Sequence, residues 1–383
     1  MDARMEQYIW QHEGWPRMTW AEEAFSGLLA EVNMLRGKLM GVISMFSFQE
    51  QNDTVLDAMS QEIVHSAKIE GQELDHDSVR SSVARQLGLS YGGLPVPDHF
   101  TEGVVQVMID ATQHYDMPLD AERLFNWHAA LFPTDRSGMY KITVGAWRCE
   151  GGAMQVVSGP MGHEQVHYEA PDNKTVPAMM NQFLSWVNAT DDNIDPLVKA
   201  AVAHLWFVTI HPFDDGNGRL CRTITEMLLS RADQTRQRYY SLSSVFLSNR
   251  KEYYNHLEQA QKGNLDVTVW IDWFLRQLKE ALLASLAKTE HVKAKRIFWD
   301  RHREVSFNDR QRKVINMLLN GFEGKLTSSK WYKINHCSQD TANRDINDLI
   351  HKGVLVREPG NGRSTAYELR GAARRILKFG RLK

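Results

Sequence analysis

Apolar residues recur at helical spacing over most of this chain, a pattern that predicts a mainly α-helical protein. Two long amphipathic stretches, residues 21–50 and 53–70, predict a helical hairpin near the N-terminus. Residues 154–169 contain two strand-like runs around a Gly-Pro turn and predict one small β-hairpin. Because an isolated two-stranded ribbon is marginally stable, we expect this hairpin to pack on helices or to offer an edge to a partner.

Two predicted helices meet at a loop near the middle of the chain. Asp195 and Pro196 open the first helix, because aspartate is a favoured N-cap residue and proline is favoured at the first helical position. That helix ends near His211, since Pro212 disfavours helical geometry in the residue before it. A second apolar series begins just after Gly218 and predicts another helix. The loop between them therefore leads into a helix N-terminus.

This loop and the first turn of the second helix, residues 211–222, read His-Pro-Phe-Asp-Asp-Gly-Asn-Gly-Arg-Leu-Cys-Arg. Unpaired N–H groups at a helix N-terminus bind anions, and Gly216 and Gly218 lack the β-carbons that would keep a phosphate away. Arg219 and Arg222 are three residues apart, so both guanidinium groups can reach phosphate oxygens from one side of the helix. The pattern predicts a triphosphate-binding site.

Two further side chains of the loop can carry chemistry. Asp215 is a hard oxygen ligand beside the expected phosphates, which suits Mg²⁺ held by one carboxylate and by substrate oxygens. His211 titrates near neutrality and can accept a proton from an incoming hydroxyl group. A lone histidine or a lone Gly-x-Gly more often belongs to an ordinary turn between helices. The functional interpretation is favoured here because many matching residue types fall in one short segment.

At every fixed position these residues resemble the motif of the Fic (filamentation) family, His-Pro-Phe-x-Asp/Glu-Gly-Asn-Gly-Arg-x-x-Arg. The resemblance implies that His211 deprotonates a Ser, Thr or Tyr hydroxyl of a target protein, which then attacks the α-phosphate of ATP and receives AMP. It further implies that Asp215 binds Mg²⁺ and that Asn217, with the loop amides, contacts the α- and β-phosphates. Arg219 and Arg222 would hold the outer phosphates.

Other segments resemble parts of Fic proteins less specifically. The hairpin of residues 154–169 resembles a flap that aligns the target segment by strand addition. The helical stretch after residue 250 resembles one that supplies the adenine pocket, for which Tyr254 and Gln261 are candidates. Residues 8–20 resemble the start of an uncharacterised domain that is often fused ahead of Fic cores.

A second short motif lies upstream, at the end of the apolar series of residues 53–70. Ser66 and Glu70 share a helix face, and Gly71 suits the helix C-terminus. A carboxylate at that end is mildly unfavourable unless it meets a cation. The resemblance supplies a cation: in many Fic proteins a Ser/Thr-x-x-x-Glu-Gly/Asn helix places its glutamate against the second motif arginine, here Arg222, and prevents productive placement of the γ-phosphate. We therefore expect Glu70 to inhibit the enzyme.

The C-terminal part of the chain is a separate basic region. Residues 291–383 hold 21 Lys and Arg against 9 Asp and Glu, a net charge of +12, whereas residues 1–290 carry −14. Three predicted helices and a hairpin in this region resemble a winged helix-turn-helix. Both DNA contact and a protein-contact or dimerisation role remain open. The polar groups that could contact DNA are Gln339, Asp340, Asn343, Arg344, Arg357 and Arg363.

The predicted architecture has three parts: an N-terminal helical region with the inhibitory helix (residues 1–97), a Fic core (98–290) and a winged-helix-like basic domain (291–383). Composition is that of an ordinary soluble globular protein. We expect a cytoplasmic protein without membrane association, because there is no membrane-length apolar run or signal-peptide core and the three cysteines are widely spaced. The family resemblance also favours a homodimer.

The predicted function is protein adenylylation, with ATP as substrate, Mg²⁺ as cofactor and a target protein, including the chain itself, as acceptor. One alternative is removal of AMP from a modified protein, or transfer of another group from a phosphate-bearing donor. The other is a DNA-binding regulator that carries a degenerate Fic core.

Overall fold

The computed structural model describes residues 8–89, 97–149, 154–158, 165–190, 193–319, 322, 324–358 and 365–370. The chain forms two compact units, Met1–Leu283 and Ala284–Lys383. Helices dominate the described residues of both units, and their strands form small antiparallel sheets, so the mainly α fold class is confirmed. The division into three domains stays a prediction, although its second boundary falls seven residues after the division between the two compact units.

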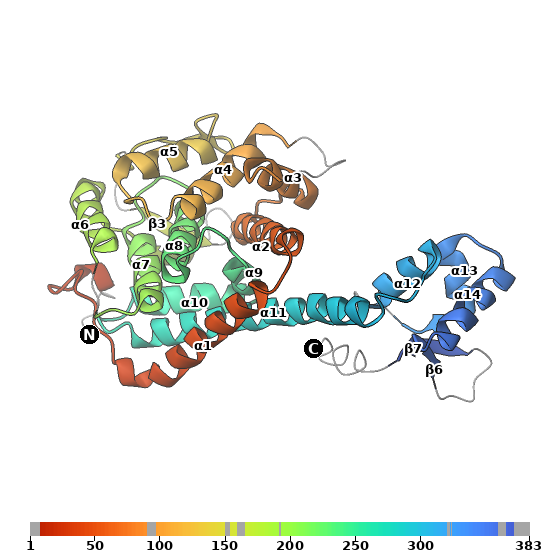
Figure 1. The fold of residues 1–383 in the computed structure, drawn as a ribbon. Helices are drawn as coiled ribbons and strands as arrows, with labels where there is room; N and C mark the ends of the chain where they lie inside the picture. The colour runs from red at the N-terminus through yellow and green to blue at the C-terminus, as the bar shows by residue number, and fades with distance from the viewer. Residues whose placement is uncertain are drawn as a thin grey trace. The chain divides into compact units, whose positions relative to one another are not determined.

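The described helices of the first unit surround a central pair, α7 and α8 (Figure 1). In chain order, all the described helices of this unit, the central pair included, are α1 (Ser26–Ile43), α2 (Phe48–Ile69), α3 (His76–Gln86), α4 (His99–Gln113), α5 (Ala121–Leu131), α6 (Val176–Asn188), α7 (Pro196–Ile210), α8 (Asn217–Asp233), α9 (Leu242–Ser248), α10 (Arg250–Gln261) and α11 (Thr268–Arg301), which runs into the second unit. Short 3₁₀ helices cover Ile9–Gln11, Glu22–Ala24 and Asn173–Thr175.

Helix α7 lies in the core because it is apolar on every side. All its residues from Ala200 to Ile210 are buried, and a helix with no polar face must be enclosed by others. The helix begins as predicted, with the Asp195 side chain accepting a hydrogen bond from the Leu197 N–H and Pro196 at its first position. Helix α8 packs along it, so the loop between them is held at both ends by the core.

Helix α2 packs mainly against α3 and α9. The predicted hairpin with α1 is therefore wrong, although both helices form. Ser47 and Glu50 cap the start of α2 reciprocally. Further along, the buried carboxylate of Glu62 accepts hydrogen bonds from Ser241 and from Ser243 at the start of α9. These polar contacts fix the orientation of α2 relative to the start of α9, and so the direction in which its C-terminal end points.

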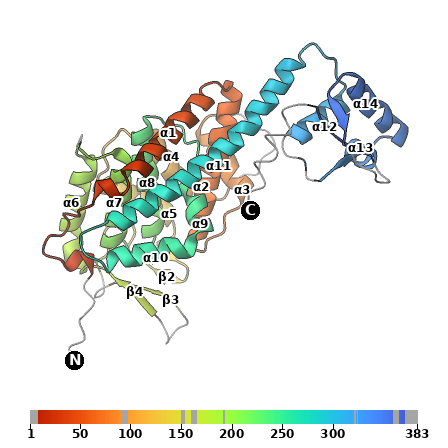
Figure 2. The ribbon, with the colours of Figure 1, turned by 90° about the horizontal axis from the view of Figure 1, so that it is seen from below.

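Two small hairpins lie at the edge of the first unit (Figure 2). Strands β1 (Arg136–Ser137) and β2 (Tyr140–Lys141) pair with each other, and so do β3 (Gln155–Ser158) and β4 (Gln165–Glu169), with β4 against α10. The second pair is the hairpin predicted from residues 154–169. Its Gly-Pro turn lies outside the described residues.

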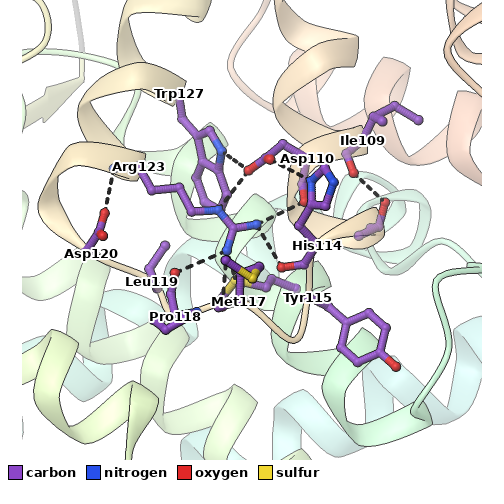
Figure 3. A network of polar contacts seen from close by, with 12 residues as sticks. Ile109, Asp110, His114, Tyr115, Met117, Pro118, Leu119, Asp120, Arg123 and Trp127 are labelled. Carbon is purple, nitrogen blue, oxygen red and sulfur yellow. Dashed lines mark hydrogen bonds and ion pairs between the residues drawn. The ribbon is translucent and has the colours of Figure 1, made fainter.

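A polar network joins α4 to α5 (Figure 3). The Asp110 carboxylate accepts hydrogen bonds from Arg123 Nε at 2.8 Å and Trp127 Nε1 at 2.7 Å, and lies 2.9 Å from His114 Nδ1. Burial raises the pKa of Asp110. The hydrogen bonds from Arg123 and Trp127 lower it by more than burial raises it, so the net pKa is below its ordinary value. The carboxylate therefore stays ionised and fixes α5, whose last turn carries His128, against α4.

The second unit has its own hydrophobic core, which includes Val314, Trp331 and Leu349. Its elements, besides the end of α11, are α12 (Asp309–Leu319), β5 (Leu326–Thr327), α13 (Ser328–Asn335), α14 (Gln339–His351), β6 (Leu355–Arg357) and β7 (Ala366–Leu369). The three strands form an antiparallel sheet in the order β5-β7-β6. Strand β5 was not predicted because two residues are too few for an alternating pattern.

Helix α14 begins with Ser338 as its N-cap. The predicted DNA-contact residues Gln339, Asp340, Asn343, Arg344 and Arg357 are exposed, whereas Arg363 lies outside the described residues. The winged-helix assignment and the DNA contact stay predictions. Within the described part of the chain, no helix combines the length and the apolar composition needed to cross a membrane.

Candidate active site

Helix α7 ends in an unusual backbone conformation at His211. This residue has φ 52° and ψ 59°, the left-handed region that residues other than glycine rarely adopt, and Pro212 follows it. Such a conformation costs about 1–3 kcal/mol and persists only where neighbouring groups enforce it. The carbonyl groups at this helix end are held accordingly: the Tyr168 hydroxyl donates to Thr209 O at 2.6 Å, and Arg148 Nε donates to His211 O at 2.8 Å.

The His211 imidazole is set up to accept a proton. Its Nδ1 lies 3.2 Å from the carbonyl oxygen of Val208 and donates to it, which leaves Nε2 as the unprotonated nitrogen. Burial lowers the pKa of His211, and Arg148 lowers it too, while the Val208 carbonyl, Glu70 and Asp215 raise it. The net pKa is below the ordinary value, so the imidazole is neutral at pH 7 and can act as a general base.

The loop after His211 is braced from within. Phe213 is fully buried and stacks on His128, with ring centroids 4.3 Å apart. The Asn217 side chain accepts from the Phe213 N–H at 3.0 Å and donates to the Phe213 carbonyl at 2.7 Å. Both ends of this amide are therefore used inside the loop. The structure thus gives the Asn217 side chain a part in shaping the loop, and the phosphate contact that the resemblance implies for this residue stays a prediction.

The start of α8 lies where the sequence predicted an anion site. Gly216 is the N-cap residue, and the helix begins at Asn217. A β-carbon added at Gly218 would collide with Glu70 Oε1, so the Glu70 side chain would have to shift to admit one. The Glu70 carboxylate thus lies directly over the first turn of α8, where free N–H groups and the helix dipole favour an anion.

Both motif arginines contact the end of α2 and the residues just after it. Arg222 Nη2 donates to Glu70 Oε1 at 2.8 Å, and the Nε of the same arginine donates to Ser66 Oγ at 2.8 Å. Arg219 Nη1 donates to Gln72 Oε1 at 2.9 Å. The structure therefore brings together Ser66, Glu70 and Arg222 as predicted, and adds Gln72, which the motif did not indicate.

The two arginines retain unused hydrogen-bonding capacity. Their side chains are almost fully buried, at 4% exposure for Arg219 and 2% for Arg222. Arg219 Nε and Arg222 Nη1 are nevertheless buried without a hydrogen-bond partner. An unpaired buried donor is costly, by about 1–3 kcal/mol, and charged donors cost more. Phosphate oxygens are acceptors that would satisfy both atoms.

Asp215 lies on the other side of the loop, beside the β1–β2 hairpin. Its Oδ2 accepts from the Ser137 hydroxyl and its Oδ1 from the Gly216 N–H, both at 2.5 Å. Among the described residues no group of three or more His, Cys, Asp or Glu side chains could hold a metal ion. A single carboxylate fits Mg²⁺ that arrives with phosphate oxygens, rather than a resident metal held by protein ligands alone.

The two candidates for the adenine pocket lie in different surroundings. Tyr254 is 39% exposed, and its hydroxyl lies 3.4 Å from the Ile69 carbonyl at the end of α2. Gln261 is 5% exposed, with its Nε2 3.5 Å from the Val208 carbonyl, the group that also accepts from His211. Tyr254 thus lies close to the inhibitory segment, whereas Gln261 supports the end of α7. Their contact with adenine stays a prediction.

Several residues around the site were not predicted from the sequence. They are Gln72, which contacts Arg219; Phe132, whose ring lies 4.8 Å from the Arg219 guanidinium carbon; Ser137, which contacts Asp215; Arg148, which contacts the His211 carbonyl; and His128, whose Nε2 lies 3.1 Å from the Asp215 carbonyl. None belongs to the motif segments, and the chain pattern around them carries no signal of function.

Comparison with known proteins agrees with this geometry. Residues 118–229 match the model of the Fic/DOC family, and residues 8–89 match that of a domain of unknown function, DUF4172. The protein adenylyltransferase Fic of Nematostella vectensis is 32% identical over 120 residues, covering 31% of this chain and 26% of that protein. The protein adenylyltransferase Fic of Aedes aegypti is 26% identical over 213 residues, covering 55% and 38%.

The fold is shared with a solved structure. The crystal structure of a Fic family protein from Desulfovibrio desulfuricans G20 is 21% identical, covers 91% of this chain and 96% of that chain, and superposes with a TM-score of 0.52. The match to the two adenylyltransferases spans less than two fifths of their length, so their names describe proteins with large parts that this chain does not match.

Proposed function

Because the chain carries a Fic/DOC family domain, we propose that it is a protein adenylyltransferase, which transfers AMP from ATP to a Ser, Thr or Tyr hydroxyl of a target protein, including itself. The observation that supports this most strongly is the Glu70 carboxylate over Gly218, bound to Arg222. A carboxylate already lies where the motif requires an anion, and two buried arginine donors beside it have no partner. The relatives named protein adenylyltransferases support the same reaction.

The proposed reaction follows from the arrangement around the loop. His211 Nε2 takes the proton from the acceptor hydroxyl as its oxygen attacks the α-phosphorus of ATP. The bond from that phosphorus to the oxygen bridging to the β-phosphate breaks, and pyrophosphate leaves. The start of α8 and the two arginines stabilise the charge on the outgoing phosphates. Asp215 would hold Mg²⁺, which would neutralise part of that charge.

In this proposal the end of α2 inhibits the enzyme. Glu70 holds Arg222 and Gln72 holds Arg219, so both arginines are engaged by the same short segment. The outer phosphates need these donors and carry negative charge of their own, which the Glu70 carboxylate repels. Productive binding of ATP therefore requires the segment to withdraw.

Incubation of a Glu70→Gly variant with radiolabelled ATP and cell lysate tests the proposal. We expect at least a tenfold rise in AMP transfer, since about 1.4 kcal/mol of lost inhibition corresponds to a factor of ten. Mass spectrometry of labelled peptides must find the increment of an AMP group on a hydroxyl side chain. The double variant Glu70→Gly, His211→Ala is the control, in which transfer should fall by about 10²–10⁴-fold. Phosphate on the peptides, or loss of AMP from a modified protein, would instead favour the alternative activities.

A further inference from the structure

A buried arginine outside the motif contacts the backbone of the catalytic loop. In the sequence, Arg148 falls between the β1–β2 hairpin and the β3–β4 hairpin, and it is only 3% exposed. Its Nε donates to the His211 carbonyl at 2.8 Å, and its backbone N–H donates to the Pro212 carbonyl at 2.9 Å. One residue thus holds two successive carbonyl groups at the point where α7 turns into the loop.

A second contact of the same guanidinium reaches the base of the flap hairpin. Arg148 Nη2 donates to the carbonyl of Pro171, two residues after the end of β4. The adjacent Ala170 N–H donates to the Met154 carbonyl at 2.8 Å and closes the base of the hairpin. The guanidinium therefore joins the backbone of His211 to the base of β3 and β4.

Burial of this charge is not explained by stability alone. Removing a cation from water costs several kcal/mol, and apolar packing would fill the same space at lower cost. The negative end of the α7 dipole offsets part of that cost. What an arginine offers here, and an apolar residue does not, is a planar group whose separate N–H donors bind two carbonyls at once.

We propose that Arg148 is a positioning residue for AMP transfer: it holds His211 in its left-handed conformation and fixes the distance between the imidazole and the flap that presents the acceptor. This inference rests on the proposed function. It assigns Arg148 to the attack step and not to nucleotide binding, because the proposed clamps of the outer phosphates, Arg219 and Arg222, belong to α8 and are held by other contacts.

Kinetics in the Glu70→Gly background test the role. Arg148→Ala should lower kcat for self-modification about 10²-fold, since misplacing a reacting group by 1 Å costs about that factor, and should leave the Kd for ATP within about twofold. Arg148→Lys should recover part of the rate, because lysine can reach one carbonyl but not both. Added guanidinium ion at low millimolar concentration should raise the rate of Arg148→Ala. Arg276→Gln removes an exposed arginine from α11 and is the matched control.

The result that would overturn the inference is a loss of ATP affinity as large as the loss of kcat, or a normal rate in Arg148→Ala. A second measurement does not depend on activity: ¹⁵N NMR of the His211 ring should show the Nδ1-protonated tautomer in the parent and a mixture of tautomers in Arg148→Lys. An unchanged ring spectrum in that variant would also overturn the inference. If Glu70→Gly itself transfers no AMP, the proposed function fails, and the ring spectrum still decides the role of Arg148.

Discussion

The ends of α7 and α2 meet at the same loop but are held in opposite ways. At the end of α7, buried donors from other elements bind the Thr209, His211 and Pro212 carbonyls. Helix α2 ends at Ile69, and Gly71, which has φ 77°, has no atom beyond its chain neighbours within 4 Å of the position of a β-carbon. The end of α2 closes on itself, with the Gln72 N–H donating to the Ala67 carbonyl, and α8 holds it only through the Arg219 and Arg222 side chains, which bind the Ser66 carbonyl and the side chains of Ser66, Glu70 and Gln72.

This contrast indicates which part can move. Displacing the end of α7 breaks several buried hydrogen bonds at once, so His211 stays in place through the reaction. Displacing the end of α2 breaks the contacts of Ser66, Glu70 and Gln72 with two arginines. Hydrogen bonds to charged groups contribute about 1.5–3 kcal/mol each. The Glu70 side chain is 32% exposed, and because water screens its charge, the Glu70–Arg222 ion pair lies at the lower end of that range. Such a segment can be displaced by a competing polyanion.

The largest expected effect comes from the fixed end. In the Glu70→Gly background, His211→Ala should lower the transfer rate by about 10²–10⁴-fold, the usual contribution of a general base. ATP affinity should stay within about twofold by titration calorimetry, because the imidazole acts on the attacking hydroxyl. An equal loss of ATP affinity would mean that His211 holds the loop together rather than accepting the proton.

Asp215→Ala should have the next largest effect. Without this carboxylate, Mg²⁺ loses its protein ligand, and transfer should fall on the order of 10²-fold because metal charge stabilisation is worth several kcal/mol. Calorimetry should find weaker binding of ATP with Mg²⁺ and unchanged binding in EDTA. Asp214→Ala is the matched control: its carboxylate accepts from the Thr143 N–H, and its removal should not alter the dependence on Mg²⁺. If ATP binding depended on Mg²⁺ to the same extent in both variants, Asp215 would not be the metal ligand.

The two ends also differ in how far the sequence could predict them. The loop of residues 211–222 was predictable because its chemistry is local: a proline after the histidine, glycines at the helix start and arginines one turn apart. The contact of Glu70 with Arg222 spans 152 residues, and only the family resemblance indicated it. The fold class was predictable from the helical spacing of apolar residues. The helices that pack against α2 were not, since an amphipathic pattern predicts that a face is buried but not which helix covers that face.

The rest of the site depends on contacts that no local pattern contains. Arg148 and His211 are 63 residues apart in the sequence, and Ser137 and Asp215 are 78 apart. The contacts of the Asn217 side chain with Phe213 were also not predicted, because the sequence does not show which backbone groups of the loop the amide reaches.

The smallest expected effect concerns the weaker contact of the movable end. Gln72→Ala alone should raise transfer by about tenfold or less, because Gln72 is partly exposed and its hydrogen bond to the Arg219 guanidinium therefore contributes at most about 1.5 kcal/mol, the lower end of the range for charged groups. The matched control is Glu73→Ala. It shortens the side chain of the next residue, which is 84% exposed and paired with Lys68, and should leave the rate unchanged. Combined with Glu70→Gly, the Gln72 change should add little, since the segment then no longer places a carboxylate against Arg222. A full additional rise in the double variant would mean that the two side chains inhibit independently, and that the end of α2 does not leave the arginines as one unit.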